Sequence, residues 1–323
     1  MAKPILGLDL GGTKIASGLV DPILGQLSGQ GLLTRPTFDP NQDIDVFGSV
    51  VAAIKTTLAT NTLSVTDIDG IGVCVPSPVD PKTGFLYNPP NLRGWANIPL
   101  RDRLQEIFGC AIAVDNDANA AALAETRWGA AKGFSKSVIY VTVSTGIGTG
   151  ILINGTILHG KNGLAGEGGH VPLDGFGQER CGCGNFGCIE ALASGTAMVK
   201  LAKKLLQDGT RHSPWIQNKI QGNLEQLDML TIGEAAQQSD PFALEIIDTQ
   251  GMRLGLWLGG MAALFDPEII VVGGGCANLG APLFNAMRQT MIQRTIHPKA
   301  AEIPIVLAQL GVASGVLGAA SLL

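Results

Sequence analysis

Three of the six cysteines and one of the four histidines fall in one short glycine-rich segment, HVPLDGFGQERCGCGNFGCIE, at residues 170–190. Cys181, Cys183 and Cys188 have the spacing C-x-C-x4-C, and His170 lies ten intervening residues upstream. Three thiolates and one imidazole form the ligand set of a closed tetrahedral zinc site, which leaves no open position for catalysis. The alternative, free or paired cysteines, is disfavoured in a chain expected to be intracellular. The segment therefore predicts a structural zinc loop, ordered by the metal because it has few apolar residues to bury.

Two carboxylates bracket this segment. Glu190 ends it, and the sequence GEGGH ties Glu167 to the predicted ligand His170, so that the metal would also fix the direction of the Glu167 carboxylate. We expect both glutamates to contact the hydroxyl groups of a polyol. Taken alone, each would more often be a solvated surface residue.

Glycine and hydroxyl residues follow apolar segments at three places. The sequence DLGGTK follows the run at residues 5–10, STGIGTG follows SVIYVTV, and the glycines of VVGGG at residues 271–275 precede a predicted helix. Glycine lets the backbone approach an anion, because it tolerates positive φ, and Thr13 and Lys14 add a hydroxyl and a cation. One such turn could be an ordinary hairpin turn. Two of them in equivalent places can clamp a polyphosphate, and the third suits the phosphates, ribose or base of a nucleotide.

The segment VDNDANAAALAE places Asp115, Asn116 and Asp117 where a predicted strand ends and a helix begins. Ligands bind at the carboxyl ends of strands in open α/β sheets. Asn116 or Asp117 could merely cap the helix. Alternatively, Asp117 could accept the proton of a sugar hydroxyl as its oxygen attacks phosphorus, for which a modest pKa suffices because the transition state is loose.

The elements that must position these residues alternate between strand and helix. A hairpin at residues 5–20 is followed by helices and by the strands IDGIGVCV and AIAVDND, and after residue 133 the order strand, Gly/Thr turn, strand (ILINGTIL) appears again. This pattern predicts two α/β domains that flank a cleft. We expect the domains at 1–118, to which a terminal helix at about 311–323 returns, and at 119–310, with the zinc loop at 170–190.

Composition excludes several classes of function. The 323 residues carry a formal net charge of -5, without the basic excess of proteins that neutralise nucleic-acid phosphates. No signal segment and no apolar run of about 18 residues is present, so no membrane partner and a cytoplasmic location are expected.

The segments DLGGTK, VDNDANAAALAE, STGIGTG, GLAGEGGHV, CGCGNFGCIEALASG and DPEIIVVGGG resemble, in this order, the motifs of the ROK family (repressors, open reading frames and kinases). That family belongs to the hexokinase, hsp70 and actin superfamily, so the resemblance implies ribonuclease H-like domains and an ATP-dependent sugar kinase. It implies Asp117 as catalytic base. It also implies sugar contacts from Asn116, Asp117, Glu167, His170 and Glu190, with His170 using one ring nitrogen for zinc and the other for the sugar. The transferring phosphate and its Mg2+ would face Asp9, Gly11, Gly12, Thr13 and Lys14. The other ATP phosphates would face Thr145 and Gly146, and the nucleoside would face Gly274 and Gly275.

Substrate choice follows from finer resemblances. The segment NPPNLRGWANIPL is similar to the NLxGW segment of ROK glucokinases and would place Asn91 near the sugar. Pro78 stands where N-acetylmannosamine kinases of the family tend to carry arginine, whereas Ser77 and Thr149 replace glycines usual in the family. We therefore expect a glucokinase that forms glucose 6-phosphate and ADP, with kinases for N-acetylglucosamine, N-acetylmannosamine or fructose as alternatives, and polyphosphate as an alternative donor.

A sugar-binding regulator is the non-enzymatic alternative. Repressors of the family carry an N-terminal helix-turn-helix, and because the predicted hairpin begins at Ile5 we expect no such DNA-binding domain here. The resemblance also implies a homodimer or homotetramer, because ROK kinases are commonly oligomers.

Overall fold

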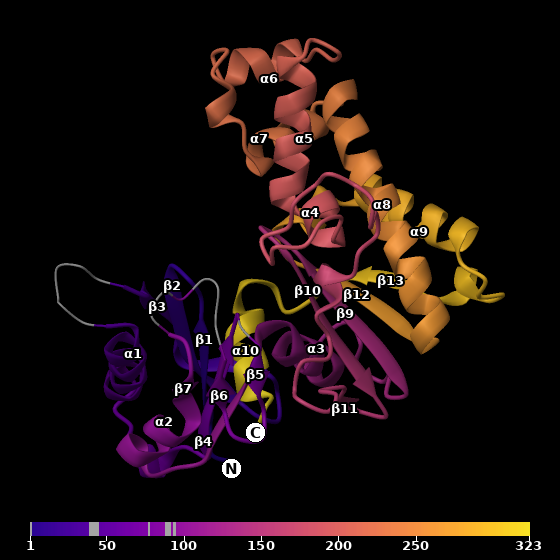
Figure 1. Cartoon of the computed structure of the whole chain (residues 1–323). Helices are drawn as coiled ribbons and strands as arrows, with labels where there is room; N and C mark the ends of the chain where they lie inside the picture. The colour runs from indigo at the N-terminus through magenta and orange to yellow at the C-terminus, as the bar shows by residue number, and fades with distance from the viewer. Residues whose placement is uncertain (1, 39–44, 77, 88–91, 93–94) are drawn as a thin grey trace. The chain divides into compact units, whose positions relative to one another are not determined.

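The computed structural model describes residues 2–38, 45–76, 78–87, 92 and 95–323 (Figure 1). Its contacts divide the chain into two compact units. The first unit comprises Met1–Tyr140, Gly150–Gly166 and Ala308–Leu323, and the second comprises Val141–Thr149 and Glu167–Leu307. This division is based only on contacts within the chain, so the predicted domain boundary after residue 118 stays a prediction.

A five-stranded sheet in the order β3-β2-β1-β4-β8 forms the centre of the first unit. Its strands are β1 (Ile5–Leu10), β2 (Lys14–Asp21), β3 (Gln26–Pro36), β4 (Gly70–Val75) and β8 (Ile112–Asn116). β1 and β2 pair antiparallel, which confirms the predicted hairpin, and β1, β4 and β8 run parallel. A small sheet of β5 (Val79–Asp80), β6 (Phe85–Leu86) and β7 (Ile98–Pro99) accompanies it.

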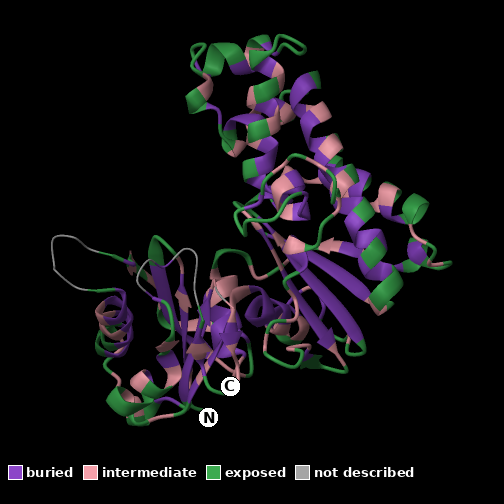
Figure 2. Ribbon diagram, in the orientation of Figure 1, coloured by how far each residue is buried: buried purple, intermediate pink, exposed green. Residues whose placement is uncertain are grey.

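Both faces of this sheet are buried, and different helices cover them (Figure 2). Leu6, Leu8 and Leu10 pack with α1 (Val46–Thr60) and α2 (Leu100–Phe108), with η1 (Val65–Asp67) nearby. The other face packs with α3 (Asp117–Trp128) and α10 (Ser314–Ala320), which follows η6 (Gly311–Ala313). Because strands buried on both faces bury every side chain, β1 and β4 are nearly continuous apolar runs rather than alternating ones.

The second sheet has the order β11-β10-β9-β12-β13. Its strands are β9 (Ser137–Val143), β10 (Ile147–Ile153), β11 (Thr156–Ile157), β12 (Ile269–Gly273) and β13 (Ile305–Leu307). The predicted restart of strand, turn and strand is confirmed, with two corrections. The turn is only residues 144–146, since the rest of STGIGTG belongs to β10. ILINGTIL is two strands, because Asn154 and Gly155 have the positive φ values of an Asn-Gly hairpin turn.

Helices make up most of the second unit. They are α4 (Ile189–Ala193), α5 (Gly195–Gln207), α6 (Pro214–Lys219), α7 (Met229–Gln237), α8 (Pro241–Phe265) and α9 (Ala281–Arg294), with the short turns η2 (Gly168–His170), η3 (Leu224–Gln226), η4 (Gly275–Leu279) and η5 (Ala300–Glu302). α8 begins after its N-cap Asp240, with proline in its first turn, and ends at the left-handed Asp266. Among the described residues, no helix is long and apolar enough to cross a membrane.

Candidate active site and metal centre

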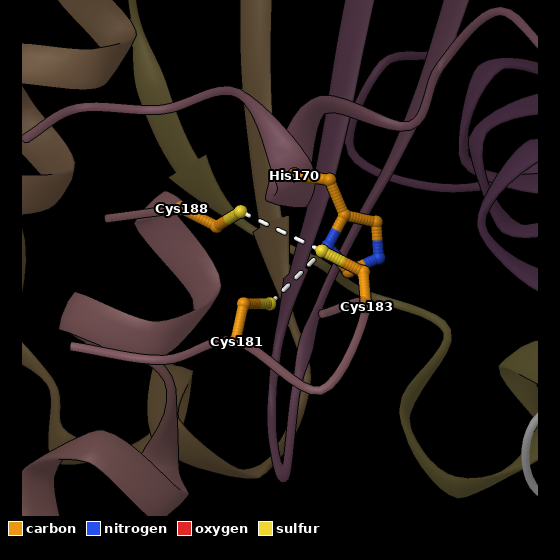
Figure 3. Close-up of side chains that lie close together, drawn as sticks. All are labelled: His170, Cys181, Cys183 and Cys188. Atoms are coloured by element: carbon orange, nitrogen blue, oxygen red, sulfur yellow. Dashed lines mark hydrogen bonds between the residues drawn. The ribbon is translucent and has the colours of Figure 1, made fainter. Parts of the chain in front are cut away.

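His170, Cys181, Cys183 and Cys188 lie together, with one potential ligand atom from each within 4.8 Å of all the others (Figure 3). The Sγ atoms of Cys183 and Cys188 are 3.7 Å apart, and Cys181 Sγ is 3.5 Å from His170 Nδ1. Tetrahedral zinc with ordinary bond lengths sets sulfur–sulfur distances of about 3.8 Å and sulfur–nitrogen distances of about 3.6 Å. The four residues therefore fit a zinc ion in both chemistry and spacing.

The predicted zinc loop, residues 170–190, is closed by backbone hydrogen bonds of its own. Pro172 forms an isolated bridge with Cys188, the residue before α4, and Cys181 N donates to Asn185 O at 2.8 Å. Phe176 is fully exposed and Phe186 is half exposed, so these two aromatic side chains contribute little buried apolar surface. That a metal ion orders the loop stays a prediction.

The thiols differ in their environments. Burial raises the pKa of Cys181 and Cys188, whereas a backbone hydrogen bond from Asn185 lowers the pKa of Cys183. A metal ion binds the thiolate form, so metal binding would release protons from this cluster.

Two glutamates join the cluster. His170 directs Nδ1 toward Cys181, and its Nε2 lies 3.9 Å from Glu167 Oε2. Glu190 Oε1 is 3.6 Å from Cys181 Sγ. Burial raises the pKa of Glu167, the neighbouring His170 opposes this rise, and the Glu190 carboxylate adds to it. The structure thus brings together the three residues of the second unit that were predicted to contact sugar.

The Ser144–Gly146 turn lies against Glu190. Glu190 Oε2 accepts a hydrogen bond from Ile147 N at 3.0 Å, and a Cβ atom on Gly146 would lie only 2.5 Å from the same oxygen. A side chain at position 146 would therefore displace this carboxylate from its place. Glu190 thereby connects the Cys/His cluster with the predicted phosphate-binding turn.

The start of α5 supports the same turn. Gly195 N donates to Ser144 O at 2.7 Å, and Thr196 Oγ1 donates to Thr145 O at 2.9 Å. Ser194 caps the helix by accepting from Ala197 N. The sequence interpretation missed Gly195 and Thr196. The signal that could have found them is ASGTA, an N-cap serine followed by glycine and threonine, which marks the start of a helix, where the positive helix end favours an anion.

The third glycine cluster packs against the same region. Gly274 has φ +83°, and a Cβ atom there would lie 2.4 Å from Val143 O at the end of β9. Gly275 is more open, since the nearest atom to its Cβ position is Ser144 Oγ at 4.0 Å. Two of the three predicted glycine clusters thus meet in the second unit.

The first glycine turn joins β1 to β2. Gly11 N donates to Lys14 O at 3.0 Å, and Thr37 Oγ1 donates to Gly11 O at 2.6 Å. Gly11 does not have the positive φ that motivated the sequence argument. Glycine is needed here because a Cβ atom would approach Lys14 O to 2.8 Å. Gly12, Thr13 and Lys14 are exposed and accessible to a ligand.

Two carboxylates of the first unit lie around one buried thiol. Cys74 Sγ donates to Asp9 Oδ1 at 3.4 Å. Burial raises the pKa of Asp9, while the Cys74 hydrogen bond and the charge of Lys14 oppose that rise. Burial likewise raises the pKa of Cys74 well above its usual range, and the negative charges of Asp9 and Asp117 raise it further. Asp9 of β1 and Asp117, the first residue of α3, therefore both act on the same buried thiol.

Asn116 and Asp117 have different tasks at the start of α3. Asn116 is the N-cap, because its side chain accepts from Ala118 N at 2.9 Å. Asp117 is the first residue of the helix, where the positive helix end favours a charged carboxylate. The capping alternative thus holds for Asn116, and Asp117 Oδ1 also accepts from Ala118 N, at 2.8 Å. Asn91, the remaining predicted sugar contact, lies outside the described residues.

Two sheets, each containing a strand–glycine turn–strand unit, carry carboxylates at one turn and a Cys/His cluster beside the other. These features define an α/β protein with an actin- and hexokinase-like fold. The chain belongs to the ROK family, whose model matches residues 5–323.

Relatives of several activities match nearly the whole chain. A glucokinase from Halalkalibacterium halodurans is 33% identical over 97% of this chain and 92% of its own. An N-acetylmannosamine kinase from Yersinia pseudotuberculosis is 32% identical over 98% of this chain and 96% of its own. A crystal structure of a ROK family glucokinase from Streptomyces griseus, in complex with glucose and AMPPNP, matches with a TM-score of 0.84 and 32% identity, covering 99% of this chain and 98% of that one.

Proposed function

We propose that the protein transfers the γ-phosphoryl group of Mg-ATP to the 6-hydroxyl of a hexose, with glucose as the preferred acceptor. The class of enzyme is a sugar kinase, since the chain is similar over nearly its full length to glucokinases. The observation that supports the proposal best is the likeness to a glucokinase in complex with both glucose and an ATP analogue.

Asp117 is assigned as the general base. Its carboxylate accepts the proton of the sugar hydroxyl while the hydroxyl oxygen forms a bond to the γ-phosphorus and the bond from that phosphorus to the bridging oxygen of ADP breaks. The position of Asp117 in the first turn of α3 favours the ionised form that a base must have. Asp9 is close enough to share a thiol neighbour with Asp117.

Asp9 is also the candidate for holding Mg2+. Magnesium is usually bound in kinases by one or two carboxylates together with substrate phosphates, and this chemistry suits a carboxylate beside an exposed glycine turn. When bound, the ion would neutralise negative charge on the phosphates. Lys14 adds a fixed positive charge at the same turn, next to Gly12 and Thr13.

The nucleotide is assigned to Thr145, Gly146, Gly274 and Gly275, with Gly195 and Thr196 added from the structure. The sugar is assigned to Asn116 and Asp117 of the first unit and to Glu167, His170 and Glu190 of the second, with Asn91 expected nearby. These assignments combine the resemblance with the local contacts described above. A homodimer or homotetramer and a cytoplasmic location belong to the same proposal.

A structural zinc ion is assigned to the zinc loop. The spacing of the four ligand atoms fits tetrahedral coordination, and His170 Nε2 faces Glu167 rather than the cysteines. Zinc would therefore fix both the ring of His170 and, through it, the setting of Glu167. The metal would support the sugar site without taking part in the reaction.

The second candidate substrate is N-acetylmannosamine. The kinase from Yersinia pseudotuberculosis, which is as similar in sequence as the glucokinases are, favours it. Pro78 weighs against it, because the resemblance places arginine there in kinases for that sugar.

ADP release with Mg-ATP tests the proposal across glucose, N-acetylglucosamine, N-acetylmannosamine, mannose and fructose, with Asp117→Asn as the control variant. We expect the fastest turnover with glucose and a loss of at least ~100-fold in the variant. The variant should unfold at nearly the same temperature, because Asn116 caps the helix. Turnover with an N-acetyl sugar alone would overturn the substrate, and a fully active Asp117→Asn would overturn the base. If no sugar released ADP, a sugar-binding regulator would take the place of the kinase.

A further inference from the structure

A buried carboxylate lies directly before the proposed catalytic turn. Asp115 is 3% exposed and is the last residue but one of β8, directly before Asn116. Its Oδ1 accepts from Asn116 N at 2.7 Å and from Asn119 Nδ2 at 3.0 Å. These two bonds tie the end of β8 to the first turn of α3 and so set the path of the backbone that carries Asp117.

His159 provides the remaining strong contact to this carboxylate. Its Nε2 lies 2.6 Å from Asp115 Oδ2, so that the two oxygens of Asp115 serve the catalytic turn and a distant loop. His159 comes from the segment after β11, which is 44 residues away in the sequence. An almost completely buried carboxylate needs partners on both oxygens, since an unpaired charge in the interior is strongly unfavourable.

The loop that carries His159 is itself anchored. Ala165 N donates to His159 O at 3.1 Å, and a Cβ atom on Gly163 would lie 2.7 Å from both Val79 O and Pro81 Cδ. The loop therefore packs closely on β5 and on Pro81, the residue that follows it. His159 is part-exposed and lines a pocket of about 370 Å³. Asp80 and Tyr87 line the same pocket, together with other residues of the His159 loop. A side chain of similar size can replace it without overpacking.

We propose that His159 is a positioning residue for the phosphoryl transfer, acting through Asp115 on the turn that presents Asn116 and Asp117. His159 donates to Asp115 Oδ2 and holds the carboxylate in the rotamer in which Oδ1 accepts from the turn. The inference rests on the proposed function. It adds a residue that touches neither sugar nor nucleotide but fixes the direction of the base.

A purely structural role predicts a different outcome from a positioning role. If His159 only stabilised the fold, its loss would lower the unfolding temperature and leave turnover per folded molecule unchanged. If it positions Asp117, its loss lowers kcat even well below the unfolding temperature, because small displacements of a reacting group cost much of the rate. KM for ATP should stay unchanged, since the nucleotide is assigned to other residues.

The test compares His159→Leu, His159→Gln and the matched control His297→Leu. His297 makes a histidine–carboxylate pair of the same length, with Nε2 2.6 Å from Asp266 Oδ1 in the second unit, and has no part in the proposed site. We expect kcat to fall by about 10- to 100-fold in His159→Leu. His159→Gln, whose amide can donate from nearly the same place, should recover much of the loss, and His297→Leu should retain the wild-type kcat.

A double variant shows whether His159 acts through the base. When two residues act as one unit, removing the second after the first costs little more. His159→Leu combined with Asp117→Asn should therefore be no slower than Asp117→Asn alone. A wild-type kcat in folded His159→Leu, or a full further loss in the double variant, would overturn the inference while leaving the kinase intact. A wild-type protein that releases no ADP would overturn the proposed function, and this inference with it.

Discussion

At the scale of single residues, two similar side chains take different places at the proposed site. Asn116 and Asp117 are neighbours, yet Asn116 is the N-cap of α3, whereas Asp117 is its first residue and accepts from Ala118 N. The sequence placed both at the strand end but could not separate the two roles, because either side chain is chemically able to cap. The choice depends on the backbone conformation of Asn116, which is extended with φ -64° and ψ 147°.

Gly146 offers a prediction at this scale. In Gly146→Ala the new Cβ atom would lie 2.5 Å from Glu190 Oε2 and would displace that carboxylate from Ile147 N. We expect weaker binding of both an ATP analogue and the hexose, each by about tenfold, the equivalent of one lost charge-assisted hydrogen bond. Calorimetric titration with each ligand separately measures the two affinities.

The control for Gly146→Ala is Gly260→Ala. Gly260 lies in α8 with nothing within 4 Å of its Cβ position, so alanine there should leave both affinities unchanged and stabilise the helix by about 0.5–1 kcal/mol. Unchanged affinities in Gly146→Ala would show that Glu190 does not support the phosphate-binding turn.

At the scale of elements, local patterns predicted the strands and helices well, and long-range contacts could not be predicted. The β1–β2 hairpin and the strands β4 and β8 were expected from their apolar runs and were found. Gly195 was missed because its partner, Ser144, is far away in sequence. Positive φ was the expected reason for glycine at position 11, and this was wrong. Glycine is needed there because Lys14 O lies close to the Cβ position, and that contact depends on how the turn closes.

The predicted zinc loop is the element whose order should depend most on a ligand. Cys183→Ser removes one of the four proposed ligands from a segment with a fully exposed Phe176. We expect this variant to lose bound zinc and to be cut by protease within residues 170–190, while the wild type is resistant. Elemental analysis gives the metal content, and mass spectrometry of the fragments gives the cleavage site.

Cys110→Ser is the matched control for the zinc loop, because Cys110 lies in the first unit, outside the cluster. It should retain zinc and resist protease like the wild type. Full zinc content in Cys183→Ser would remove the four-ligand site.

At the scale of the whole molecule, the two ends of the chain depend on each other within the first unit. β1 begins at residue 5, and α10 lies among the last residues, yet α10 packs on β1 and β4. Glycines in these strands permit the approach: a Cβ atom on Gly7 would lie 2.0 Å from Val316 O, and one on Gly72 would lie 1.8 Å from Ala319 O. The sequence suggested that a terminal helix returns to the first domain, but the glycines that face it were hidden in ordinary strand patterns.

Gly72→Ala tests this dependence. The added methyl group overlaps backbone atoms of α10, which can relieve the overlap only by moving off the sheet. We expect the free energy of unfolding to fall by about 1–3 kcal/mol or more. Urea unfolding should show a lower midpoint, and amide exchange in α10 should be faster than in the wild type. Because α10 also packs on α3, which begins with Asp117, the displacement should lower kcat as well as stability. A variant with wild-type stability and protected α10 amides would show that the last helix is not held against the sheet at this distance.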